Sequence, residues 1–144
     1  MYEIADISHG IKNDSTLEIL KESMFNPTEE KVIQRANFYE NKKGIVSYGY
    51  IYDDIILGLI VLDTTSKDEV IILDIAVRGD KQKIGIGSTL INYVIHQLKP
   101  RALVAETDDD AVDFYKKNKF KIVNLGEKYS NVNRYKCEFI RTIL

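Results

Sequence analysis

The chain has 144 residues, of which 44% are hydrophobic and 29% charged, and its formal net charge is −2. This composition is ordinary for a globular protein and excludes an intrinsically disordered chain. The slightly acidic balance disfavours nucleic-acid binding through bulk positive charge. The length predicts a single domain over residues 1–144.

The first part of the chain predicts one strand and two helices. Residues 1–8 alternate weakly, as an opening strand does. Ser15 is a candidate helix cap that Glu18 completes as a capping box, and Thr28 is a second candidate cap. The helix that begins after Thr28 is expected to end at residues 41–44. Apolar side chains recur at helical spacing in both segments, at Leu17, Leu20 and Met24 and then at Val32, Ile33, Ala36 and Tyr39.

Three strands are predicted next. Residues 45–52 and 55–62 form a hairpin around Asp53-Asp54. Residues 69–77 are apolar on both faces, which is typical of a strand in the middle of a covered sheet. A polar loop at residues 78–85 leads into a helix that turns five apolar side chains inward, namely Leu90, Ile91, Val94, Ile95 and Leu98.

The last part of the chain adds a strand, a helix and two closing strands. Residues 102–105 are a short buried strand, and acidic residues 108–110 stand where a helix N-terminus favours them. The helix carries Phe114 and Tyr115, and residues 120–125 and 134–140 close the fold. This order predicts an α/β protein with a mixed sheet and at least one strand–helix–strand crossover.

The segment that indicates chemistry is residues 75–88, where a buried strand ends, a loop turns and a helix begins. Such a junction directs unpaired backbone N–H groups outward at the positive end of a helix dipole. Gly85 and Gly87 remove side chains where an anion would approach the backbone. Positive charge and a hydroxyl come from Lys81, Lys83 and Ser88. The pattern predicts a pyrophosphate site, and a simple tight turn is the alternative interpretation.

Two familiar phosphate loops are excluded. A P-loop requires Gly-Lys-Ser/Thr, whereas Gly87 is followed by Ser88-Thr89. A dinucleotide fingerprint requires a third glycine three residues after the second, and Leu90 occupies that position.

The pattern Gln82-x-x-Gly85-x-Gly87 resembles the acetyl-coenzyme A motif of the GNAT superfamily of N-acetyltransferases. Residues 105–120 resemble the strand and helix that follow in that family, where a Phe/Leu-Tyr pair precedes a closing Gly-Phe. The resemblance covers residues 45–125. It implies the GNAT acyltransferase fold, a central and largely antiparallel mixed sheet flanked by helices. It also implies transfer of an acetyl group from acetyl-coenzyme A to a primary amine.

The resemblance further implies how the cofactor is held. The backbone of Ile75, Ala76 and Val77 should pair with the pantetheine amides, because the family's sheet splays there. The loop amides should bind the pyrophosphate, at Gln82, Lys83, Ile84, Gly85, Ile86, Gly87 and Ser88. Asp108 stands where many members have Asn, and it can accept but not donate a hydrogen bond. Lys119 replaces a usual glycine, so positive φ is not expected there.

Tyr115 matches the family tyrosine near the thioester sulfur, and it is our candidate general acid, with core packing as the alternative. Asp74 and Glu106, near strand ends, are candidate general bases. Each could instead be a structurally paired or solvated carboxylate, with waters relaying the proton. No Ser-His-acid or Cys-His arrangement indicates a covalent intermediate, so direct attack in a ternary complex is expected.

Other function classes stay open at this stage. A non-catalytic acyl-coenzyme A binding or sensing module is the first alternative, and an interaction domain that binds no coenzyme is the second. The acceptor could be a polyamine, an amino acid, an antibiotic or a protein amino group. Tyr48, Tyr50 and Tyr52 share one strand face and could line its pocket or form the polar face of a hairpin.

The remaining expectations concern location and partners. Cys137 is the one cysteine, so there can be no internal disulfide or cysteine-based zinc site, and a cytoplasmic location fits. His9 and His96 have no metal-ligand spacing, so no metal is expected. The N-terminus lacks a signal-peptide pattern, and the longest apolar run, residues 55–62, is far short of the ~20 residues that span a bilayer. A homodimer is possible.

Overall fold

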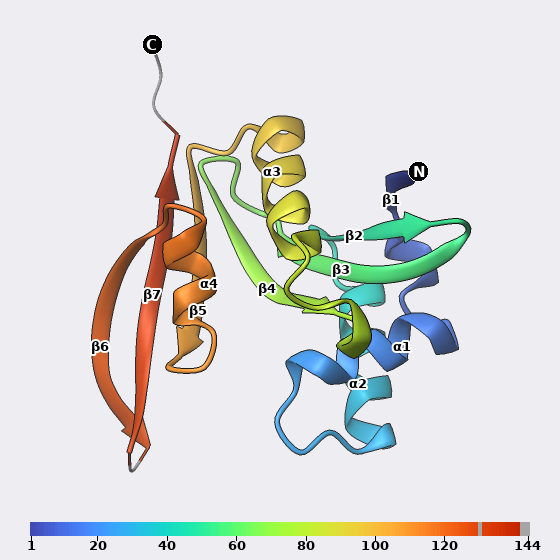
Figure 1. Cartoon of the computed structure of the whole chain (residues 1–144), viewed down its shortest axis with the longest axis horizontal. Coiled ribbons are helices and arrows are strands. Elements are labelled where there is room, and N and C mark those ends of the chain that lie inside the picture. Colours follow the sequence, from blue (N-terminus) through green and yellow to red (C-terminus); the bar gives the residue numbers. More distant parts are fainter. Residues whose placement is uncertain (130, 142–144) are drawn as a thin grey trace.

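A seven-stranded sheet organises the chain in the computed structural model, which describes residues 1–129 and 131–141 (Figure 1). The strands are β1 (Tyr2–Asp6), β2 (Ile45–Tyr52), β3 (Ile55–Asp63), β4 (Glu69–Val77), β5 (Ala102–Asp108), β6 (Lys121–Tyr129) and β7 (Val132–Ile140). The helices are α1 (Asp14–Leu20), α2 (Glu29–Asn41), α3 (Ile86–Leu98) and α4 (Val112–Lys117), with short 3-10 turns η1 (Ser8–Gly10), η2 (Lys21–Ser23) and η3 (Gly79–Lys81).

The strand order is β1-β2-β3-β4-β5-β7-β6. Every neighbouring pair is antiparallel except β4 and β5, which are parallel and are joined by the crossover helix α3. The predicted mixed, largely antiparallel sheet with a crossover is therefore confirmed. Among the described residues, no helix is long and apolar enough to cross a membrane.

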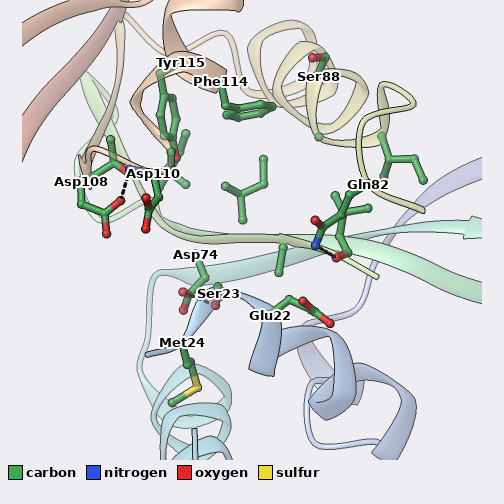
Figure 2. A pocket seen from close by; sticks show the side chains of 18 of the residues that line it. Glu22, Ser23, Met24, Asp74, Gln82, Ser88, Asp108, Asp110, Phe114 and Tyr115 are labelled. Atoms are coloured by element: carbon green, nitrogen blue, oxygen red, sulfur yellow. Dashed lines mark hydrogen bonds between the residues drawn. The ribbon is translucent and has the colours of Figure 1, made fainter. Parts of the chain in front are cut away.

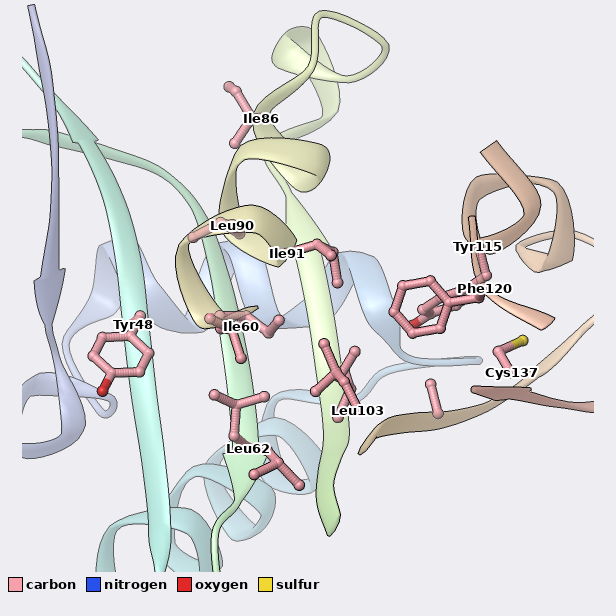
Figure 3. Close-up of a cluster of buried hydrophobic side chains, with 14 of the residues drawn as sticks. Tyr48, Ile60, Leu62, Ile86, Leu90, Ile91, Leu103, Tyr115, Phe120 and Cys137 are labelled. Atoms are coloured by element: carbon pink, nitrogen blue, oxygen red, sulfur yellow. The ribbon is translucent and has the colours of Figure 1, made fainter. Parts of the chain in front are cut away.

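Two apolar clusters cover the two faces of the sheet, as the alternation along β3 illustrates. Ile60 and Leu62 pack with Leu90 and Ile91 of α3 on one face, together with Leu103 of β5 (Figure 3). The neighbouring residues of β3 face the opposite way and pack against the N-terminal helices, in a cluster of Leu59, Val61, Ile19, Leu20, Val32 and Ala36. Since each fully buried aliphatic side chain stabilises the fold by about 1.5–3 kcal/mol, the central strands are fixed from both sides.

The start of α2 was predicted correctly and the start of α1 was not. The Thr28 hydroxyl accepts a hydrogen bond from the backbone N–H of Lys31 at 3.2 Å, as an N-cap does. By contrast, α1 begins at Asp14, and no side chain caps it. The amides of Thr16 and Leu17 both donate to the Asn13 carbonyl, so the helix has already begun before Ser15. The helix also stops at Leu20, so Met24 lies outside it in extended backbone.

Lys119 adopts the positive φ that was not expected of it, at +69°. It is the residue after the C-cap of α4 in a Schellman motif. The amide of Lys119 donates to the Lys116 carbonyl, and the amide of Phe120 donates to the Tyr115 carbonyl. The rings of Tyr115 and Phe120 also pack edge to face with centroids 5.2 Å apart. These contacts hold a strained lysine where glycine would be unstrained.

Strands β4 and β5 stay together over a short distance. Their pairing runs from Glu69 with Ala102 to Ile71 with Val104, although β4 continues to Val77 and β5 to Asp108. Beyond that point β4 stays paired with β3, and β5 with β7. The facing edges of β4 and β5 therefore separate, and the backbone groups on the β4 edge lose their neighbour on that side.

Candidate active site

A cleft of about 750 Å³ opens where β4 and β5 separate (Figure 2). One wall is the end of β4 with the loop and first turn of α3. The second is the end of β5 with α4, which contributes Phe114 and Tyr115. The third comes from η2, α2 and the segment between them, and it includes Ser23, Phe25 and Arg35.

The cleft brings together residues that the sequence analysis singled out separately. The candidate catalytic residues Asp74, Glu106 and Tyr115 all line it. So do all but one of the candidate cofactor-binding residues, namely Ile75, Ala76, Val77, Gln82, Lys83, Gly85, Ile86, Gly87, Ser88 and Asp108. The exception is Ile84, whose side chain is 69% exposed.

The N-terminus of α3 presents free backbone donors to this cleft. Gly85 precedes the helix with φ +97°, and no side chain caps the helix. The first helical hydrogen bond runs from the Thr89 amide to the Gly85 carbonyl at 2.9 Å, which leaves the amides of residues 86–88 without an acceptor within the helix. A Cβ at Gly85 would meet nothing within 4 Å, so space lies open beside it. Free amides, a helix dipole and open space fit a diphosphate.

The loop between β4 and α3 is held by its own side chains. Gln82 Nε2 donates to the Val77 carbonyl at 3.0 Å, which ties the loop to the end of the strand. Arg78 forms a double hydrogen bond to Asp80 at 2.6 and 2.7 Å, and this guanidinium holds the pKa of Asp80 down to about 2. Arg78 does not line the cleft, and the positively charged residues that this loop contributes to the lining are Lys81 and Lys83.

Gly87 has a packing role that the sequence did not indicate. A Cβ at this position would lie 2.9 Å from Cε1 of Phe114, closer than real Cβ contacts allow. The absence of a side chain therefore lets α4 pack against the first turn of α3. This contact gives Gly87 a structural role besides the approach of an anion to the backbone.

Tyr115 is buried and lies between Phe114 and Phe120, with ring centroids 5.2 Å from each. Burial raises its pKa well above the usual range, and the nearby Cys137 and Asp74 side chains act in the same direction. The hydroxyl is therefore protonated at neutral pH, so it carries the proton that a general acid would donate.

The two candidate bases have contrasting surroundings. Asp74 is 7% exposed, and its carboxylate accepts hydrogen bonds from Ser23, Arg35 and Tyr39. Burial raises the pKa of Asp74, whereas these three donors oppose the shift. Glu106 instead has an exposed side chain on the far wall of the cleft. Asp74 is thus a paired carboxylate and Glu106 a solvated one.

A backbone irregularity turns Asp74 toward α2. Val61 of β3 pairs with Asp74 and Leu62 pairs with Ile72, so Leu73 is an extra residue in β4. Such a bulge bends a strand and changes the side to which the next side chain points. Figure 2 shows Asp74 beside Ser23, on the opposite side of β4 from Phe114 and Tyr115.

Several cleft residues were missed, and one predicted group lies elsewhere. Ser23 and Arg35 gave no motif, although Arg35 flanks the apolar stripe of α2 and could have been noticed there. Tyr48, Tyr50 and Tyr52 do not line this cleft. Instead Tyr48 packs against Tyr93 with centroids 5.1 Å apart and Tyr50 stacks on Tyr2 at 4.5 Å, so both rings are engaged in aromatic packing away from this cleft.

Asp108 also lines the cleft, but its carboxylate is already engaged. Its Oδ1 accepts a hydrogen bond from the backbone amide of Asp110 at 3.0 Å, which shapes the turn into α4. Within residues 1–129 and 131–141, no group of three or more His, Cys, Asp or Glu side chains could hold a metal ion.

Comparisons with known proteins agree with this architecture. Residues 13–120 match the sequence family described as "Acetyltransferase (GNAT) family". An aminoglycoside 6'-N-acetyltransferase complexed with coenzyme A is similar in structure with a TM-score of 0.81 at 13% identity, over 97% of this chain and 96% of that one. A search of the curated proteins finds no match.

Two further solved structures have the same fold. The ribosomal-protein-S18-alanine N-acetyltransferase from Escherichia coli has a TM-score of 0.73 at 16% identity, over 100% of this chain and 96% of that one. A GNAT family acetyltransferase from Elizabethkingia anophelis with acetyl-CoA bound has a TM-score of 0.71 at 20% identity, over 97% of this chain and 98% of that one. The fold implied by the sequence resemblance is therefore confirmed.

Proposed function

The chain belongs to the acetyltransferase (GNAT) family, and we propose that it moves an acetyl group from acetyl-coenzyme A to a primary amine by direct attack in a ternary complex. The observation that carries this proposal is the separation of β4 from β5. It places the unpaired edge of β4, the uncapped start of α3 and the Tyr115 side chain around one cleft.

The cofactor half of the cleft comprises Ile75–Val77, the loop at residues 78–85 and the first turn of α3. Bound acetyl-coenzyme A would supply an acetyl group activated as a thioester. The backbone of Ile75–Val77 would pair with the amides of its pantetheine arm, as a neighbouring strand would. The amides of residues 86–88, with Lys81 and Lys83, would neutralise its diphosphate. Two structural neighbours carry coenzyme A or acetyl-CoA, which supports this assignment.

The acceptor half comprises Ser23, Met24, Phe25, Arg35 and Asp74, with Glu106 on the opposite wall. An amine is protonated in water, so a base must remove a proton before its nitrogen can attack the thioester carbonyl. Asp74 and Glu106 are the candidates. As the C–S bond breaks, the Tyr115 hydroxyl would protonate the thiolate. Holding the two reactants together supplies most of the rate enhancement.

Coenzyme binding and acetyl transfer can be tested separately. Calorimetry with coenzyme A should give binding, and Lys81→Gln with Lys83→Gln should weaken it, whereas Lys116→Gln on the exposed side of α4 should not. A thiol-release assay over polyamines, amino acids, aminoglycosides and peptides should then identify an acceptor class. Coenzyme binding with no transfer to any amine would instead favour a binding or sensing module. An absence of coenzyme binding would overturn the acetyltransferase and the binding module alike.

A further inference from the structure

The carboxylate of Asp74 has no free acceptor position, which restricts how it can take up a proton. Oδ1 accepts hydrogen bonds from Ser23 Oγ at 2.8 Å and from Arg35 Nη1 at 3.2 Å. Oδ2 accepts from the Tyr39 hydroxyl and, at 3.4 Å, from the same Arg35 nitrogen. A carboxylate offers about four acceptor sites. An incoming proton therefore requires one of these donors to turn away.

Ser23 is the donor that has somewhere else to turn. Its Oγ lies 2.8 Å from Asp74 Oδ1 and 2.9 Å from the Leu20 carbonyl oxygen, and a hydroxyl has a single proton to donate. Arg35 cannot accept a hydrogen bond and stays charged in proteins. In the part of the chain that the structure describes, the Tyr39 hydroxyl contacts no acceptor besides Asp74.

This geometry satisfies both protonation states of Asp74 without moving a heavy atom. In the ionised state the Ser23 proton points to Oδ1. In the protonated state the carboxyl proton on Oδ1 is donated to Ser23 Oγ, and Ser23 directs its own proton to the Leu20 carbonyl. Each donor therefore keeps an acceptor in either state.

Building on the proposed function, we propose that Ser23 is a positioning residue that lets Asp74 act as the general base of acetyl transfer by exchanging its proton between two acceptors. The neutral acceptor nitrogen forms a bond to the thioester carbonyl carbon, and its N–H proton passes to the Ser23–Asp74 pair, which ends with one added proton on Asp74 Oδ1. The C–S bond breaks, and the thiolate takes the Tyr115 proton. Asp74 and Tyr115 then return to their starting states by exchanging a proton with solvent.

The other groups that face Asp74 are consistent with this role. Arg35 and Tyr39 reach it from α2, Tyr115 interacts with its charge from α4, and β3 places the apolar Val61 opposite. The Glu22 carboxylate of η2 points away, toward Gly79. Burial raises the pKa of Asp74, which makes it a stronger base than an exposed aspartate. Both Asp74 and Ser23 border the cleft, so an amine held there can reach the pair.

The test compares Ser23→Ala with Ser23→Thr, which keeps a hydroxyl, and with Ser15→Ala, an exposed serine on α1. The titration of Asp74 is followed by carbon NMR of its carboxyl group in the whole chain, and the pH profile of kcat/KM is followed for the best amine. Ser23→Ala should move the Asp74 titration and the acid limb of the kcat/KM profile to higher pH by roughly half to one unit. The lost hydrogen bond stabilises the ionised carboxylate more than the neutral acid, so its removal raises the pKa of Asp74. Ser23→Ala should also lower kcat about tenfold with coenzyme A affinity unchanged. Ser23→Thr, which keeps the hydroxyl, should restore the Asp74 titration toward that of the unmodified chain, and Ser15→Ala should change neither the titration nor the rate.

Different failures have different signatures. An Asp74 titration that does not move in Ser23→Ala overturns the proton exchange, whether or not the chain acetylates amines. A titration that moves while the acid limb of kcat/KM stays in place overturns Asp74 as the base and leaves acetyl transfer standing. An unmodified chain that binds coenzyme A but acetylates no amine overturns the proposed function, and the NMR titration still decides whether Ser23 exchanges its proton with Asp74.

Discussion

The cofactor half of the cleft comes from one continuous stretch of chain, whereas the acceptor half is assembled from distant segments. Strand β4, its loop and the start of α3 follow each other directly, and they offer the cleft the free edge of β4 and the unpaired amides at the start of α3. In the acceptor half, Ser23 and Asp74 are 51 positions apart, and Arg35 and Asp74 are 39 apart. Backbone geometry therefore defines the first half and side-chain identity the second.

This difference has a consequence for substitutions. A backbone site tolerates changes of side chain provided that the turn, the glycines and the strand edge persist. A side-chain site changes its chemistry with each substitution. We therefore expect variants of the cofactor half to act through packing and coenzyme affinity, and variants of the acceptor half to act through proton transfer and the KM of the amine.

The largest effect is expected where the two halves meet, at Tyr115. Tyr115→Phe removes the proposed acid while keeping the ring between Phe114 and Phe120. Its kcat should fall roughly 100-fold, within the range that general acids contribute, and coenzyme A affinity should stay within about twofold. Steady-state thiol release measures kcat, and calorimetry measures coenzyme A affinity. Tyr93→Phe, in a tyrosine that packs against Tyr48 outside the cleft, should leave both unchanged, and full turnover in Tyr115→Phe would refute the acid assignment.

A packing change should follow for Gly87→Ala in the cofactor half. The new Cβ would press on Cε1 of Phe114 at 2.9 Å, so the Phe114 ring or the helices that carry the two residues must shift. Overpacking of this kind costs about 1–3 kcal/mol of unfolding free energy. Coenzyme A binding should weaken with it, while the KM for the amine changes little. Chemical denaturation and calorimetry give the two quantities.

A double substitution tests the cause of that effect. Phe114→Leu removes the ring atoms that the new Cβ would meet, so Gly87→Ala should cost less in its presence than alone. Equal costs with and without the ring would show that the glycine serves something other than the packing of α4.

A smaller effect, visible as a pH dependence, is expected for Asp74→Asn in the acceptor half. Burial raises the pKa of Asp74 in the folded chain above its ordinary value of 3.8, so between these values the folded state binds more protons than the unfolded state. Its contribution to stability is complete below pH 3.8 and is lost as the pH rises through the folded pKa. Asparagine does not titrate.

Denaturation at a series of pH values measures this contribution. The unfolding free energy of the unmodified chain should decline relative to Asp74→Asn from pH 3.8 upward, by about 1.4 kcal/mol for each unit by which the pKa is raised. Asp68→Asn, at an exposed aspartate before β4, should run parallel to the unmodified chain. A parallel course for Asp74→Asn would mean that the donors from Ser23, Arg35 and Tyr39 fully offset burial.

The same contrast explains what could be predicted from the sequence. The order of elements, the crossover and the loop from Gln82 to Ser88 follow from local patterns, and they were found. The cluster around Asp74 was not, since its partners meet only after α2 has packed on the sheet and a bulge at Leu73 has turned the side chain. The periodicity of hydrophobic residues along the sequence indicates which faces of the helices and strands are buried. It does not indicate which polar side chains will face each other across a cleft.

The smallest effect is expected at Lys119. This residue does not line the cleft, but it follows the C-cap of α4, the helix that carries Phe114 and Tyr115. Its φ of +69° strains any residue that has a Cβ, and the Schellman hydrogen bonds keep it there. Lys119→Gly should relieve about 1 kcal/mol of strain, less the extra entropy of glycine in the unfolded chain. Lys119→Ala keeps the Cβ and should gain nothing, so the difference between the two variants in chemical denaturation isolates the backbone. If both variants gain the same unfolding free energy, the charge of Lys119 lowers the stability and its positive φ does not. The end of α4 that holds Tyr115 would then be free of conformational strain.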